Sequence, residues 1–262
     1  MKKLLFLLLA APFLLASCTK DEEENNQTQN SDIEVAQEQE AFVMLTTATW
    51  CGYCGSWGIP TFDGAYEGQS GIDPDKVNGC ALHYSGSDPM YHQMAKTMKD
   101  QFGIGGPPNL WIEFDNSYNL QPSGWESAIV SRQDETNPSC GIGFNVEKSG
   151  DDFTVDVKVE FFESLTGTYN LAIYVNESGI IANQSGSSSN HNHKHVLRGE
   201  ITADDPWGVE IFSGSSPQEY TETFTFTADS NMDAANLSFV AVVYEMNGNT
   251  PVASPNSNTW FQ

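Results

Sequence analysis

The spacing of apolar residues changes near Pro138, and this change limits the folds open to the chain. Before Pro138, short apolar runs alternate with patterns typical of helices. The strands expected there are 41–46, 77–84 and 109–114, and the helices begin near 52 or span 90–102 and 123–135. After Pro138, apolar residues occupy alternate positions, as in Phe153, Val155 and Val157, and helical patterns disappear.

This change predicts two domains. An α/β domain is expected over residues 39–138, followed by an all-β, Ig-like antiparallel sandwich over residues 139–262. Further strands of the sandwich are expected near 142–146, 171–175, 195–202, 220–227 and 237–246.

The N-terminus has the features of a secreted, lipid-anchored protein. Lys2 and Lys3 precede an apolar stretch of about 13 residues, which is shorter than the roughly 20 residues that a membrane-spanning helix needs. The stretch ends in Leu-Ala-Ser-Cys, which resembles a bacterial lipobox. We therefore expect residues 1–17 to be a lipoprotein signal peptide and Cys18 to carry lipid such as palmitate. The alternative is an ordinary cleaved signal with an incidental cysteine.

Residues 18–38 are acidic, rich in Asn, Gln and Ser, and poor in apolar side chains, so we expect a disordered tether. Its start, Lys20 followed by four acidic residues, resembles the signal that sends Bacteroidetes lipoproteins to the outer face of the outer membrane. The expected location is thus the outer membrane with the protein facing the cell exterior. A plain acidic linker, and a protein that faces the periplasm, are the alternatives.

The charge of the chain excludes one class of partner. The sequence has 11 basic and 35 acidic residues, a formal net charge of −24. Such a field repels nucleic acid and anionic membrane surfaces. We therefore expect no nucleic-acid partner, and attachment to the membrane through the lipid on Cys18.

The motif Thr49-Trp50-Cys51-Gly52-Tyr53-Cys54 predicts redox chemistry. Its two thiols are three residues apart, and a strand before them with a helix after them would place Cys51 at a helix N-terminus. Unpaired N–H groups there stabilise a thiolate. Cys54, one turn later, would be the resolving thiol.

This segment resembles the thioredoxin superfamily, and a second motif strengthens the resemblance. The loop Gly105-Gly106-Pro107-Pro108 is similar to the one in which thioredoxins carry a cis-proline, which places Pro108 in that role. The resemblance implies that Cys51 attacks, Cys54 resolves, Trp50 shields the site and Pro108 positions the substrate backbone. Leu45 departs from the family, because thioredoxins have a buried acid six residues before the first cysteine.

Two cysteines remain outside the motif and the lipobox. Cys80 and Cys140 are candidates for a structural disulfide in an oxidising compartment, or for buried free thiols.

Three histidines alternate in the second domain. In an extended strand His191, His193 and His195 would share one face, which could bind zinc or copper if a fourth ligand arrives. The alternative is a polar strand, and apart from this cluster we expect no cofactor. His83 and His92 are expected to be packing or surface residues.

Taken together, these features resemble the Bacteroidetes outer-membrane lipoproteins related to the twenty-eight-kilodalton outer membrane protein. The resemblance rests on the following residues: Trp50, Cys51, Gly52, Cys54, Gly55, Trp57, His193, His195, Val196, Leu197 and Arg198. It implies a thioredoxin-like domain followed by the sandwich, and thiol–disulfide exchange on protein substrates. The alternatives are a non-catalytic surface binding or adhesion lipoprotein in which Cys51–Cys54 is a structural disulfide, and metal capture by the histidines.

Overall fold

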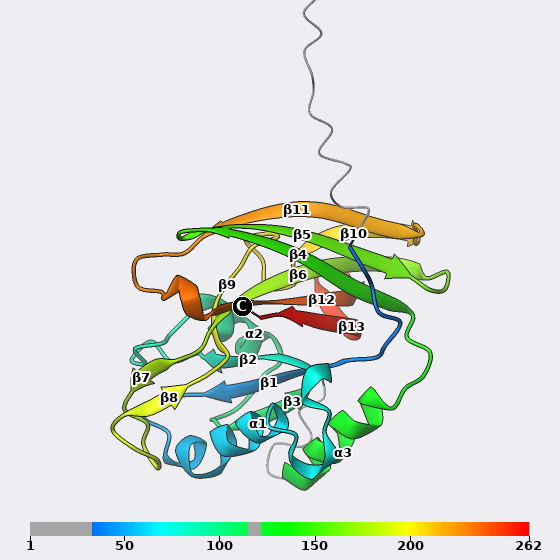
Figure 1. Ribbon diagram of the computed structural model, residues 1–262. Helices are drawn as coiled ribbons and strands as arrows, with labels where there is room; N and C mark the ends of the chain where they lie inside the picture. Colours follow the sequence, from blue (N-terminus) through cyan, green and yellow to red (C-terminus); the bar gives the residue numbers. More distant parts are fainter. Residues whose placement is uncertain (1–32, 115–121, 262) are drawn as a thin grey trace, which may run out of the picture.

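The computed structural model describes residues 33–114 and 122–261, and strands make up most of its regular secondary structure (Figure 1). The helices are α1 (Ile59–Ala65), α2 (Gln93–Gln101) and α3 (Pro122–Gln133). The strands before α3 are β1 (Ala41–Thr47), β2 (Val77–His83) and β3 (Asn109–Ile112). The strands after it are β4 (Cys140–Ser149), β5 (Asp152–Phe161), β6 (Thr166–Glu177), β7 (Ile180–Ala182), β8 (His191–His193), β9 (Val196–Glu200), β10 (Val209–Ser215), β11 (Glu219–Thr227), β12 (Leu237–Asn247) and β13 (Thr250–Trp260).

The largest of the described sheets contains strands from both halves of the chain. Seven of its eight strands run in the order β13-β12-β6-β9-β2-β1-β3, and β10 pairs with the other end of β6. β1 and β2 are parallel, whereas β3 and β12 are antiparallel to their neighbours. The sequence predicted the main strands but not this continuity, because apolar spacing does not specify which strands pair. The division of the chain near Pro138 stays a prediction.

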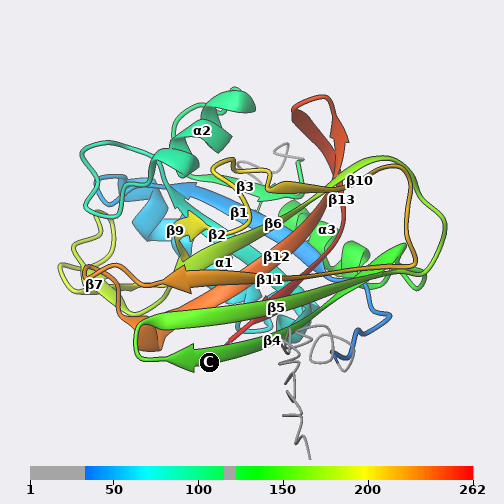
Figure 2. The same cartoon turned by 90° about the horizontal axis from the view of Figure 1, so that it is seen from above.

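The two larger sheets and the helices form layers, and β7 and β8 pair in a separate two-stranded sheet (Figures 1 and 2). The three-stranded antiparallel sheet β11-β5-β4 covers one face of β6 and β12, and Val157, Ile173 and Phe239 are part of the apolar core between them. The other face of these two strands packs in a second core that includes Met98 of α2. A third core lies between β1 and the helices α1 and α3.

β1 is buried on both faces, which explains its unbroken apolar sequence. Phe42 and Met44 enter the core with α2, whereas Val43 and Leu45 enter the core with α1. This packing fixes β1 in the middle of the molecule and holds in place the turn that follows it. Within the described ranges, no helix combines the length and the hydropathy that crossing a membrane requires.

Candidate redox site

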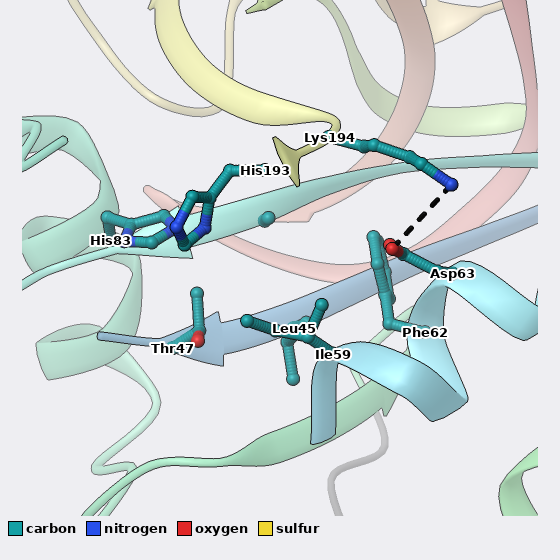
Figure 3. A pocket seen from close by; sticks show the side chains of 9 residues that line it. Leu45, Thr47, Ile59, Phe62, Asp63, His83, His193 and Lys194 are labelled. Atoms are coloured by element: carbon teal, nitrogen blue, oxygen red, sulfur yellow. Dashed lines mark ion pairs between the residues drawn. The ribbon is translucent and has the colours of Figure 1, made fainter. Parts of the chain in front are cut away.

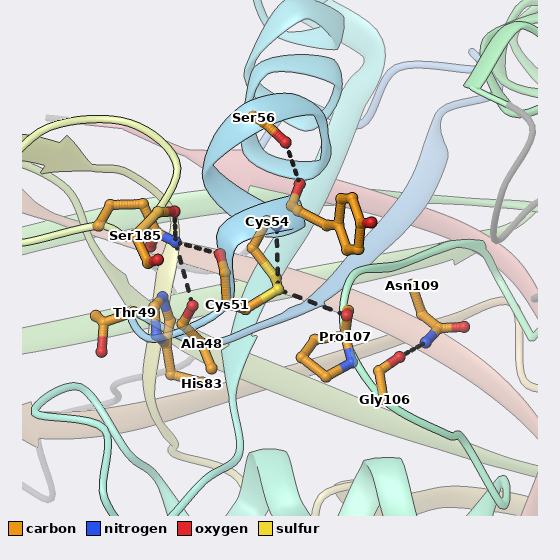
Figure 4. The surroundings of a disulfide bond; sticks show 12 residues. Ala48, Thr49, Cys51, Cys54, Ser56, His83, Gly106, Pro107, Asn109 and Ser185 are labelled. Carbon is orange, nitrogen blue, oxygen red and sulfur yellow. Dashed lines mark hydrogen bonds between the residues drawn. A yellow bond between two sulfur atoms is a disulfide. The ribbon is translucent and has the colours of Figure 1, made fainter.

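A disulfide between Cys51 and Cys54 lies where β1 gives way to a helix (Figure 4). The Cys51 N–H donates to the carbonyl oxygen of Ala48 at 3.0 Å, and this bond closes the turn. Helical backbone begins at Gly52. The Cys54 N–H donates to Cys51 Sγ at 3.0 Å. This backbone donor would stabilise a thiolate at Cys51 once the disulfide is reduced.

The helix that carries Cys54 starts with a wider turn. Residues Cys54–Gly58 form a π-helical segment, in which the Ile59 N–H bonds to the Cys54 carbonyl, and α1 follows directly. Pro60 has no N–H with which to continue the regular α-helical pattern. Single π-helical turns of this kind are frequent at functional sites.

The loop before β3 completes the site from the opposite side. The Pro107–Pro108 peptide bond is cis, as the motif predicted. The Pro107 carbonyl oxygen lies 3.5 Å from Cys51 Sγ. Gly58 permits this approach, because a Cβ atom there would lie 2.5 Å from Cβ of Pro108.

Access to the disulfide is narrow. Cys51 is 6% exposed and Cys54 is fully buried. The two aromatic residues of the motif are open to solvent, with Trp50 51% and Tyr53 73% exposed. Trp50 and Tyr53 are therefore exposed side chains of the motif, whereas both cysteines are almost closed to solvent.

A buried histidine–aspartate pair binds the backbone of the turn that precedes Cys51. His83 Nδ1 lies 3.0 Å from Asp88 Oδ2, and the same oxygen accepts the Thr49 N–H at 2.7 Å. Burial by itself would raise the pKa of Asp88, but the hydrogen bond and charge of His83, with the N–H donors of Met90 and Thr49, outweigh burial and lower that pKa. Asp88 thus anchors the residue two positions before Cys51.

A small cavity lies behind the helix of the motif (Figure 3). It is lined by Leu45, Thr47, Ile59, Phe62, Asp63, Ala81, His83, His193 and Lys194. Burial raises the pKa of Asp63 to about 6, and Lys194, whose Nζ is 3.8 Å away, acts in the opposite direction. Burial, with the charges of His83 and His191, lowers the pKa of His193 to about 3. Leu45 thus lines the same cavity as four titratable side chains, those of Asp63, His83, His193 and Lys194.

The three histidines that could have formed a metal site do not come together. His191 and His193 are neighbours, with ring centroids 4.7 Å apart, but His195 lies beyond the end of β8 with a φ of 54° and stacks on Tyr66 at 3.8 Å. The positive φ turns this residue out of the strand alternation on which the prediction rested. In the described part of the chain, no three His, Cys, Asp or Glu side chains are grouped to hold a metal ion.

The candidate disulfide between Cys80 and Cys140 is not formed either. Both are buried free thiols, and they lie in different apolar cores, on β2 and β4. Burial raises the pKa of both thiols, that of Cys140 to about 12. Cys18 lies outside the described residues.

Two side chains at the site were not identified from the sequence. His83 was expected to be a packing or surface residue, and the β1–β2 register that places it opposite Thr47 could not be predicted from the sequence. Gln184 gave no signal at all. Its side-chain amide, from the loop between β7 and β8, donates to the carbonyl oxygen of Cys51 at 3.0 Å.

Comparison with known proteins gives a family and a fold. Residues 95–256 match the family model described as outer membrane protein Omp28. The structure is similar to HBP35 of Porphyromonas gingivalis, with a TM-score of 0.72 and 17% identity over 87% of this chain and 76% of that one. A domain of the outer membrane lipoprotein Omp28 from Porphyromonas gingivalis matches with 21% identity and a TM-score of 0.31, over 45% of this chain and 96% of that one. No curated protein sequence matches this chain.

Proposed function

Because this chain belongs to the Omp28 family of outer membrane proteins, we propose that it is a lipid-anchored outer-membrane protein that exchanges disulfides with protein substrates at Cys51 and Cys54. The observation that supports this most directly is the arrangement around Cys51. Its sulfur accepts the Cys54 N–H at 3.0 Å and lies 3.5 Å from the carbonyl of Pro107, next to a cis bond. Residues 39–138 would form a thioredoxin-like unit and residues 139–262 an Ig-like sandwich.

The exchange would proceed in two steps. The Cys51 thiolate attacks a disulfide of the substrate, which forms a mixed disulfide and releases one substrate sulfur as a thiolate. The Cys54 thiolate then attacks Cys51 Sγ, which restores the Cys51–Cys54 disulfide and releases the second substrate sulfur. Two electrons pass to the substrate, and the reverse sequence oxidises a substrate dithiol.

The residues around the cysteines would have different roles in this exchange. The Cys54 N–H stabilises the attacking thiolate, and the backbone at Pro107 and Pro108 lies where an extended substrate chain would pass. Trp50 and Tyr53 present apolar surface beside the sulfur atoms. Burial of Cys54 keeps this thiol from reacting with anything except Cys51.

Activity of the full-length protein in detergent tests the proposal. The rate of reduction of a fluorogenic peptide disulfide in a glutathione buffer should fall to background in Cys51→Ser, and Cys54→Ser should accumulate a mixed disulfide that a reductant releases. Cys140→Ala, which removes a thiol in a different core, is the matched control and should keep the wild-type rate. An unchanged rate in Cys51→Ser would exclude the proposed activity.

The lipid anchor is a separate part of the proposal. The lipobox-like sequence before Cys18 and the acidic residues after it support attachment to the outer membrane with the protein facing outward. Cys18→Ser should release the protein from the membrane fraction. Protease added to intact cells should digest the wild-type protein if it faces outward, whereas resistance would indicate that it faces the periplasm.

The burial of the disulfide favours a second candidate function. A bond whose sulfur atoms are almost closed to solvent could serve only to fix the turn. The protein would then be a non-catalytic surface binding or adhesion lipoprotein. In that case Cys51→Ser would lower the unfolding temperature without loss of any exchange activity.

A further inference from the structure

The loop between β7 and β8 lies directly against the redox turn, although more than 130 residues separate them in the sequence (Figure 4). The Ser185 N–H donates to the Thr49 carbonyl oxygen at 2.8 Å. A Cβ atom on Gly55 would lie 2.2 Å from the Ser185 carbonyl oxygen. A Cβ atom on Gly186 would lie 2.0 Å from the carbonyl oxygen of Gly52. Glycine on both sides of the contact therefore allows backbone to touch backbone.

One side chain of this loop reaches under the turn. Gln184 is 1% exposed, and its Nε2 donates to the carbonyl oxygens of Ala48 at 3.2 Å and Cys51 at 3.0 Å. A third carbonyl, that of Ser185, lies 3.1 Å from the same nitrogen. Three carbonyl oxygens can only accept, so they require the NH₂ end of the amide to face them.

The two carbonyl groups that Gln184 holds belong to the turn that positions the sulfur atoms. The Ala48 carbonyl accepts the Cys51 N–H, and the Cys51 carbonyl accepts the Gly55 N–H at 3.3 Å. The side chain of Gln184 thus donates to the same two carbonyl oxygens, those of Ala48 and Cys51, that accept the backbone hydrogen bonds of the turn. Loss of the amide would leave buried carbonyl groups with fewer donors and would free the peptide units on either side of Cys51 to rotate.

We propose that Gln184 is a positioning residue for the redox site, and that it favours the reduced form of the Cys51–Cys54 pair. It does so through the turn, because its amide holds the Cys51 carbonyl oxygen and keeps the Cys54 N–H directed at Cys51 Sγ. This donor stabilises a thiolate at Cys51 more than it stabilises the disulfide. The loop also closes one side of the site, so a substrate must approach past Trp50 and Tyr53.

This inference deepens the proposed function and rests on the same pair of cysteines. Its test is the equilibrium of the full-length protein with a glutathione or dithiothreitol buffer, read by mass spectrometry after alkylation. Gln184→Glu keeps the shape of the side chain and removes both donors. We expect the equilibrium to move about tenfold toward the disulfide, which corresponds to about 30 mV for a two-electron couple. The pKa of the Cys51 thiol, read from thiolate absorbance, should rise.

Gln133→Glu is the matched control. Gln133 is also a buried amide whose Nε2 donates to two carbonyl oxygens, those of Asp73 at 2.9 Å and Lys76 at 3.0 Å, but it lies away from the cysteines. It should lower the unfolding temperature and leave the equilibrium unchanged. Gln184→Met, which has neither donors nor charge, repeats the test if the glutamate variant does not fold.

The inference is overturned if the Gln184 variants shift the equilibrium no more than Gln133→Glu does. This result is distinct from failure of the proposed function. A wild-type protein that reduces no peptide disulfide, but whose equilibrium responds to Gln184, would refute the activity and retain the positioning role.

Discussion

Gly58→Ala places a methyl group between the helix of the motif and the cis-proline loop, and the structure predicts the sign of its effect. Gly58 has φ −62° and ψ −55°, so its backbone is helical and alanine would be favoured there by about 1 kcal/mol. The new Cβ atom, however, would lie 2.5 Å and 2.9 Å from Cβ and Cγ of Pro108. The proline ring cannot rotate away from it. Overpacking of this kind costs about 1–3 kcal/mol, and so short a contact with a rigid ring places the cost near the upper limit.

We therefore expect a net loss of up to about 2 kcal/mol in the free energy of unfolding. Urea unfolding of the oxidised protein measures it. The proline ring should also move away from Cys51. The rate of peptide disulfide reduction should therefore fall by more than the fraction of unfolded protein explains.

Gly64→Ala in α1 is the control. A Cβ atom there would lie 2.5 Å from Oε1 of Gln69, which is the end of a flexible side chain and can move. This variant should be as stable as the wild type, or more stable by up to about 1 kcal/mol. If Gly58→Ala proves as stable as Gly64→Ala, the proposed packing of the helix on Pro108 is wrong.

Three further changes test the surroundings of the site. Asp88→Asn should lower the free energy of unfolding at pH 7 by about 2–3 kcal/mol, because it weakens a charged hydrogen bond to His83, and urea unfolding will show this. The pKa of Asp88 is lower in the folded protein than in the unfolded chain. The stability that its carboxylate contributes is therefore complete above the unfolded pKa and is lost as the pH falls through the folded pKa. The Asp88→Asn variant should thus lose less stability on acidification than the wild type. Between pH 6.5 and 3 the unfolded histidine binds a proton and the folded one does not, so His193 makes the wild type lose stability as the pH falls. His193→Phe should therefore lose about 1.4 kcal/mol less stability per pH unit in this range than the wild type. Unfolding curves across the range measure this difference. Native alkylation at pH 8 should leave Cys80 and Cys140 unmodified, since burial keeps both thiols protonated, and mass spectrometry that finds either one modified would contradict their burial.

The sequence was most informative where the local pattern matched the local environment. The apolar run Ala41–Leu45 predicted a strand, and the structure shows one that is buried on both faces. For β6 the alternation of Leu171, Ile173 and Val175 indicated one buried face only. Tyr174 on the other face is also buried, because the large sheet packs on a second core.

Strand β13 was not predicted, because its sequence is polar and contains two prolines. It is an edge strand, where proline is tolerated. The Asn256 side chain donates to the carbonyl oxygens of Glu38 and Cys140, both at 2.8 Å. Hydrogen bonds from side-chain amides therefore help to hold β13 in place, and the spacing of apolar residues does not reveal such bonds.

In the candidate site too, some residues could be predicted from the sequence and others could not. The cysteines and Pro108 are adjacent to recognisable motifs, so their positions could be predicted from the sequence. The roles of His83 and Gln184 depend on strand pairing and on a loop from the far half of the chain. The alternation that placed His195 beside His191 failed because a positive φ interrupts the strand.

The most direct test of the central claim is the reduction potential of the Cys51–Cys54 disulfide in the full-length protein, measured at equilibrium with defined thiol buffers. A protein that exchanges disulfides with substrates should have a potential between about −270 and −120 mV. A value below about −300 mV is typical of structural disulfides. It would contradict the proposed exchange and support the role of a surface binding protein with a fixed turn.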